Sequence, residues 1–159
     1  MKYPAGSVYV TWTEDVTRVE YNSAQELRWA NNLGDWLDAN GVEQGTQAFA
    51  SAAVVDDNLE KTVDIDVTSL VANHGADFRV NRSGGTSYVF HSRESAEAAK
   101  RPVLLVTKGG VTSKLQAAAD SSMTGTSKVS QGKGTTLSTT SGFLIRFSQG
   151  SDSTIQKAT

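Results

Sequence analysis

The chain contains no cysteine, which excludes a disulfide framework and any metal site built from thiolates. Only two of its 159 residues are proline, and no apolar run reaches the roughly 18 residues of a membrane-spanning helix. The N-terminal Met-Lys-Tyr-Pro lacks the apolar segment of a secretory signal. The length fits one domain with a substantial hydrophobic core.

The charges are unevenly distributed along the chain, although the net charge is only −2. Residues 1–77 contain thirteen acidic and four basic side chains, whereas residues 78–159 contain four acidic and eleven basic ones. If the two halves lie on opposite faces, this difference favours head-to-tail contacts between copies. No basic cluster is interleaved with aromatic residues, so we do not expect nucleic-acid binding.

The most regular pattern lies in residues 63–71, where apolar and acidic side chains first alternate. The alternation over Val63–Val67 predicts a strand with one buried face. An apolar pair then forms one side of a helical turn, which Asp66 or Thr68 can cap. Further strands are predicted at residues 7–12, 16–21, 48–55, 77–81, 86–91, 102–107, 128–130, 135–138 and 143–147.

The composition changes after Gly109-Gly110, because residues 111–159 hold nineteen Ser or Thr and no proline. We interpret the glycine pair as the end of a first segment, which gives the following residues freedom to reach elsewhere. Alternation over Phe143–Phe147 predicts a strand there rather than a disordered stalk. The sequence therefore predicts an all-β, jelly-roll-like antiparallel β-sandwich with at most one or two short helical turns.

The apolar positions of these strands predict the core of the sandwich. The side chains that we expect on its inner faces are Val63, Ile65, Val67, Leu70, Phe78, Val80, Phe90, Leu105, Ile145 and Phe147.

Four motifs in order resemble the second half of the DNRLRE-type carbohydrate-binding module. They are Val-Asp-Ile-Asp-Val-Thr-Ser-Leu-Val at residues 63–71, Asp-Phe-Arg-Val at 77–80, Val-Phe-His-Ser-Arg-Glu at 89–94 and Arg-Pro-Val-Leu-Leu-Val-Thr at 101–107. The resemblance implies a non-catalytic jelly-roll sandwich of the kind found beside polysaccharide lyases and in large surface proteins.

The order of the motifs departs from that family. Residues 1–108 resemble the family's second half, and residues 112–159, with Leu-Ile-Arg-Phe at 144–147, resemble its first half. We expect one domain over residues 1–159, either circularly permuted within one chain or completed by strand exchange with a neighbouring copy. A cut from a tandem array is a third explanation, against which the initial Met argues.

Few residues are arranged for chemistry. His74 and His91 lie in different elements without a third metal ligand, and the carboxylates of 64–66 share a solvent face. Asp56 and Asp57 are weak candidates for a structural calcium site. No nucleophile elbow or phosphate-binding loop is present, so we expect no catalytic residues, no other cofactor and no enzyme activity.

Two functions remain open. One is a structural subunit that assembles with copies of itself and other subunits into a virion decoration, fibre or extracellular filament, located on a virion or cell surface. The alternative is a carbohydrate-binding module that acts with polysaccharide-degrading enzymes. In that case Trp29, Trp36 and Tyr88 would stack against sugar rings, since aromatic faces cover the apolar side of a pyranose.

Overall fold

The computed structural model describes residues 2–8, 12, 20–22, 25, 27–31, 33–54, 59–123 and 132–159. This part of the chain contains an α-helix, α1 (Thr68–His74), and a short 3-10 helix, η2 (Ala98–Lys100). The strands in it are β1 (Lys2–Val8), β2 (Glu20–Asn22), β3 (Leu27–Arg28), β4 (Trp36–Leu37), β5 (Ala50–Ala53), β6 (Asp77–Val80), β7 (Val89–His91), β8 (Val103–Lys108), β9 (Val111–Ser122), β10 (Thr136–Ser138), β11 (Phe143–Phe147) and β12 (Ile155–Ala158).

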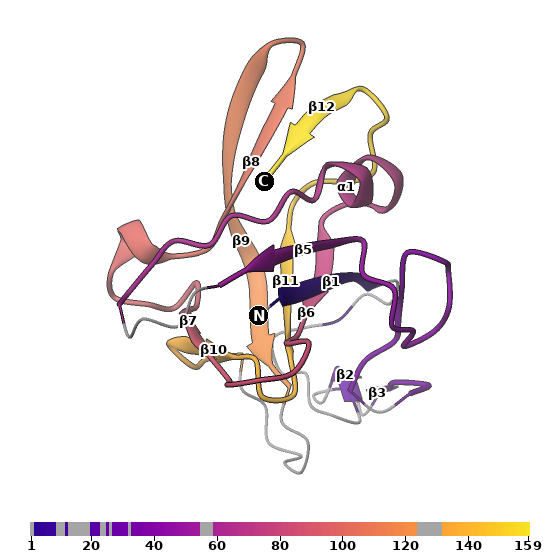
Figure 1. The fold of residues 1–159 in the computed structure, drawn as a ribbon, viewed down its shortest axis with the longest axis vertical. Coiled ribbons are helices and arrows are strands. Elements are labelled where there is room, and N and C mark those ends of the chain that lie inside the picture. Colours follow the sequence, from indigo (N-terminus) through magenta and orange to yellow (C-terminus); the bar gives the residue numbers. More distant parts are fainter. Residues whose placement is uncertain are drawn as a thin grey trace.

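The main sheet has the strand order β12–β8–β9–β11–β6–β1–β4, and β5 also pairs with β1. β9 joins its two parts, because residues 111–116 pair with β8 and residues 117–122 pair with β11. The sheet curls along β9, so that its two parts face one another around a shared core (Figure 1). All pairings are antiparallel, and the predicted all-β sandwich is confirmed.

Gly109 and Gly110 form the two-residue turn between β8 and β9, with Lys108 paired to Val111. Their φ angles are +56° and +76°, the conformation that a type I′ hairpin requires and that glycine adopts without strain. Our expectation that this pair gives the following residues freedom to reach elsewhere is therefore wrong. The hairpin geometry returns the chain at once, and the Ser/Thr-rich residues that follow form the longest strand of the described residues.

β11 is buried on both faces and separates two apolar clusters. Phe143, Ile145 and Phe147 lie in the larger cluster inside the curl, together with Leu70 and Phe78. Leu144 points to the opposite face, where a smaller cluster also contains Val8, Trp12, Trp29, Ala119 and Met123. The loops after β1 thus cover the outer face of the sheet and bury it.

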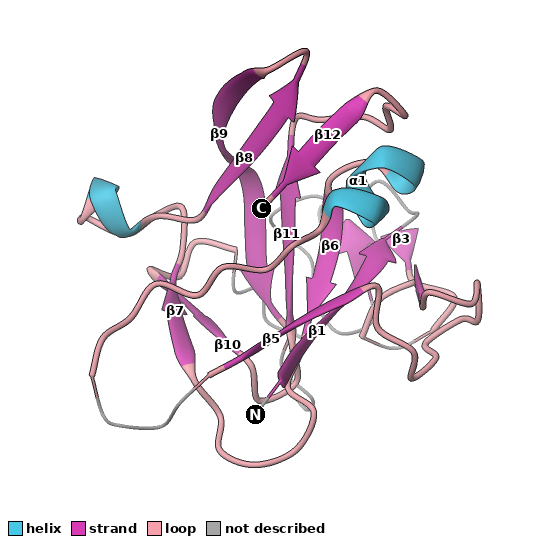
Figure 2. Cartoon of the chain, turned by 45° about the horizontal axis from the view of Figure 1, so that its top comes forward, coloured by secondary structure: helices cyan, strands magenta, loops and turns pink. Residues whose placement is uncertain are grey.

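Residues 63–67 differ from the prediction, because they alternate in burial but belong to no strand. The backbone amide of Val67 donates to Ala158 O at 3.0 Å. Within residues 63–67, this backbone contact with β12 is made by the last residue, Val67. The predicted helical turn is present as α1, which lies beside β12 (Figure 2). Asp66 Oδ1 accepts the Thr68 amide at 3.0 Å, which makes Asp66 the residue that supports its start.

The predicted core is largely correct. Leu105 is wrong by one position: it is 40% exposed, while Leu104 and Val106 on the alternate face of β8 are buried. Every second position of this apolar run can face inward, so its composition does not fix the register. Half-buried are Val63, Ile65 and Phe90. Confirmed as buried are Val67, Leu70, Phe78, Val80, Ile145 and Phe147.

Replacing Phe147 by alanine is expected to lower the free energy of unfolding by about 3–5 kcal/mol, since its ring is buried against Phe78 at 6.2 Å. Phe90→Ala should cost less because Phe90 is half-buried. Val89→Ala, at a 65% exposed position, serves as the control and should change stability by less than about 0.5 kcal/mol. Urea denaturation measures all three, and equal losses for both phenylalanines would contradict this packing.

Candidate functional site

The three predicted sugar-stacking residues do not lie on one face of the sheet. Trp29 is only 6% exposed and belongs to the outer cluster, so its ring is covered. Trp36 is half-buried against the same cluster. Tyr88 is half-buried against the inner cluster, on the opposite side of β11. The role of these residues in sugar binding stays a prediction.

The outer face of β6 and β11 carries charged side chains under the loops. Asp77 and Arg79 alternate with the inward-facing Phe78 and Val80, and Asp77 is the cross-strand neighbour of Arg146. Sequence alternation alone predicts that such residues face solvent. Here the tryptophan-containing segments before β5 pack over them, and two arginine–tryptophan stacks result.

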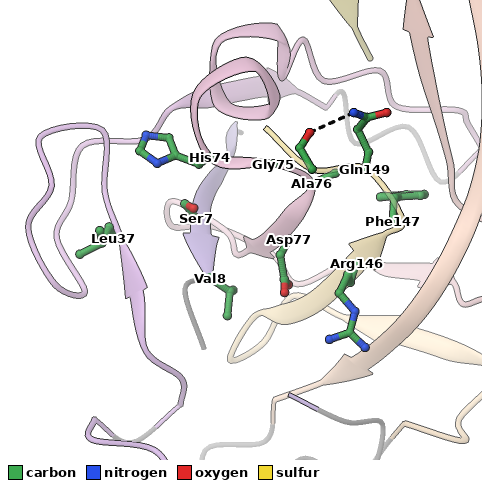
Figure 3. Close-up of a pocket in the computed structure, with 11 residues that line it drawn as sticks. Ser7, Val8, Leu37, His74, Gly75, Ala76, Asp77, Arg146, Phe147 and Gln149 are labelled. Atoms are coloured by element: carbon green, nitrogen blue, oxygen red, sulfur yellow. Dashed lines mark hydrogen bonds between the residues drawn. The ribbon is translucent and has the colours of Figure 1, made fainter. Parts of the chain in front are cut away.

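The first stack holds Asp77. Trp12 Nε1 donates to Asp77 Oδ1 at 2.7 Å, and Arg146 Nη1 donates to Trp12 O at 2.8 Å. The Arg146 guanidinium carbon lies 4.9 Å from the centre of the Trp12 ring. Asp77 and Arg146 line a cleft of about 420 Å³, which Ser7 and His74 also border (Figure 3).

Burial raises the pKa of the Asp77 carboxyl to about 7, and the Trp12 hydrogen bond and the charge of Arg146 offset only part of this effect. Asp77 therefore changes its charge near neutral pH inside a cleft. Ser7 and His74 border the same cleft, and Asp77 supplies it with a group that binds a proton near neutral pH.

The second stack holds Arg79, whose guanidinium carbon lies 4.8 Å from the centre of the Trp36 ring. Arg79 borders another hollow of about 510 Å³. The lining of this hollow is polar and contains two arginines; it consists of Leu33, Arg79, Asn81, Arg82, Gly84, Gly85, Thr139, Thr140 and Ser141. An arginine- and hydroxyl-lined hollow of this kind suits a hydrogen-bonding ligand.

A serine, a histidine and a glutamate are aligned near β7. Ser95 Oγ lies 2.9 Å from His91 Nδ1, and His91 Nε2 lies 2.9 Å from Glu60 Oε1. Ser95 is 4% exposed, its hydroxyl accepts the Glu97 amide at 3.3 Å, and it borders neither hollow. We interpret this row as a support of the turn before η2 rather than a nucleophile with its base.

The calcium candidates Asp56 and Asp57 lie outside the described residues. Among the described residues, no group of three or more His, Asp or Glu side chains is placed to hold a metal ion. The same part of the chain contains no helix with the length and apolar composition needed to cross a bilayer. Comparison with protein-family models, with curated proteins and with solved structures found no match.

Sequence reasoning missed Asp77, Arg79 and Arg146 as site residues. The available signal was the placement of charged residues within short apolar strands, in a chain whose three tryptophans all lie within residues 12–36. That signal does not say which face the segment covers, because the covering loops are distant in sequence.

The Asp77 carboxyl is expected to make stability depend on pH between about 4 and 7. Its pKa rises from 3.8 to about 7 on folding, so the folded state keeps a proton that the unfolded state releases. The free energy of unfolding should thus fall by about 2–4 kcal/mol as pH increases through this window. Asp77→Asn should remove this fall.

Chemical denaturation at pH 5 and pH 8 measures the difference. The exposed carboxylate of Asp64 provides a matched control, and Asp64→Asn should keep the wild-type pH dependence. An unchanged pH dependence in Asp77→Asn would contradict the assignment.

Proposed function

We propose that the chain is a non-catalytic structural β-sandwich subunit that assembles with copies of itself into a surface structure, such as a virion decoration, a fibre or an extracellular filament. The observation that supports this proposal is the edge of β9. Residues 111–116 pair with β8 on one side only, and within the described residues no strand pairs with their other side. The hairpin extends away from the body of the molecule (Figure 1).

The exposed edge has the properties of a pairing surface. In an antiparallel two-residue hairpin, the amide and carbonyl groups of every second residue point away from the paired strand. In β9 these residues are Thr112, Lys114 and Gln116, whose backbone groups point away from β8. The segment has no proline or bulge and only one charge, and Val111 at its end is 68% exposed. Unpaired strand edges with little such protection readily add a strand from another chain.

The edge can pair with the same edge of a second copy. Two copies of residues 111–116 can pair antiparallel about a twofold axis, which joins two three-stranded units into one continuous sheet. Such a contact closes as a dimer. The same edge against a different edge of the next copy would not close and would give a fibre. Mass in solution separates these two architectures.

Thr112→Pro is expected to abolish self-association while the domain stays folded. Proline removes the outward amide at residue 112 but leaves the inward-facing pairs with β8 in place. Sedimentation velocity over a concentration series should show dimers or larger species for the wild type and monomers for Thr112→Pro.

Thr107→Val is the matched control. The Thr107 and Thr112 hydroxyls lie 2.7 Å apart, so both variants lose this contact, yet only Thr112→Pro alters the edge. Thr107→Val should associate like the wild type. A wild-type chain that stays monomeric at high concentration would overturn the proposal.

A further inference from the structure

Arg79 is a buried cation with incomplete hydrogen bonding. It is 8% exposed, and burial lowers the pKa of its guanidinium to about 10, which leaves it charged at neutral pH. Nη2 donates to Ser141 O at 3.1 Å. Nε is buried and donates to no acceptor within the described residues. A buried donor without an acceptor is costly, and a buried charge without a partner is more so.

No carboxylate in the described residues pairs with this guanidinium. Asp77 lies two positions earlier on the same face of β6, but its partners are Trp12 and Arg146. The two stacked arginines therefore differ: Arg146 has an acid beside it, whereas the partners of Arg79 among the described residues are the Trp36 ring and a carbonyl oxygen. The positive charge of Arg79 is left without a counter-ion from this part of the chain.

The hollow beside Arg79 adds a second cation. Arg82 also lines it and donates to the carbonyl of Gly85, and the described lining contains no acidic side chain. Gly142 leaves room for the Arg79 guanidinium, because a Cβ at that position would lie 3.1 Å from its Nη2. The local sequence thus holds a buried guanidinium in place beside a solvent-accessible space of about 510 Å³.

We propose that this hollow binds an oxyanion, with Arg79 as its main charged partner and Arg82 as the second. Guanidinium groups form strong charge-assisted hydrogen bonds with carboxylate and sulfate oxygens, and low local polarity strengthens them. The hydroxyl-bearing residues Thr140 and Ser141 line the same space. An oxyanion here supplies the counter-charge that the described residues do not provide for Arg79. The group arrives either as a free ion or as part of a larger ligand such as an acidic sugar.

Thermal unfolding with added sulfate, acetate or glucuronate tests the site, with chloride at matched ionic strength as the reference. At about 100 times the dissociation constant, a ligand specific for the folded state is expected to raise Tm by about 5–10 °C. Arg79→Met should lose this shift. Arg28→Met, which removes an exposed guanidinium outside the hollow, should retain it.

The pattern among the ligands identifies the source of the oxyanion. A larger shift with glucuronate than with acetate supports a site for a saccharide-borne carboxylate, whereas shifts with sulfate and acetate alone support a site for a free ion. If Arg79→Met does not fold, Arg82→Met should still fold, and the dissociation constant of the bound oxyanion should rise about tenfold. The proposal would be overturned if chloride raised Tm as much as the oxyanions do. It would also be overturned if Arg79→Met and Arg82→Met both kept the wild-type shift.

Discussion

The burial of β11 on both faces is the constraint on which the rest of the structure depends. Phe143, Ile145 and Phe147 require an apolar layer on one side, and Leu144 requires another on the opposite side. The curl at β9 supplies the first layer by folding β8 and β12 over the strand. The loops with Trp12 and Trp29 supply the second layer, and they must therefore cross the outer face of the sheet.

Covering that face has an electrostatic consequence. Because side chains alternate along a strand, Asp77 and Arg79 share the face of Leu144, where Arg79 is buried and Asp77 is half-buried. Tryptophan is suited to this position, because its ring stacks on a guanidinium and its indole N–H satisfies a carboxylate. The Trp12 ring stacks on the Arg146 guanidinium, and its indole N–H donates to the Asp77 carboxylate. The displaced pKa values of Asp77 and Arg79 result from the same desolvation.

Local pattern predicted the all-β class, the helical turn that follows Val67 and the strands around Phe78 and Ile145. It failed where a pattern has two solutions: the apolar run of β8 fits either face, and Gly109-Gly110 fits either a boundary or a type I′ turn. The charged outer face was not predictable, since its burial is decided by loops that are distant in the sequence. The resemblance to the carbohydrate-binding module stays a prediction.

The two proposed surfaces use different parts of the sandwich. The open edge lies on the first half of β9, which pairs with β8 in the projecting hairpin. Arg79 lies on β6, on the other side of β11, where the covering loops hold it. Pairing at the edge removes backbone groups from solvent and does not depend on charge, whereas the hollow depends on a fixed guanidinium. The proposed pairing through the hairpin would therefore leave the arginine hollow accessible on each copy.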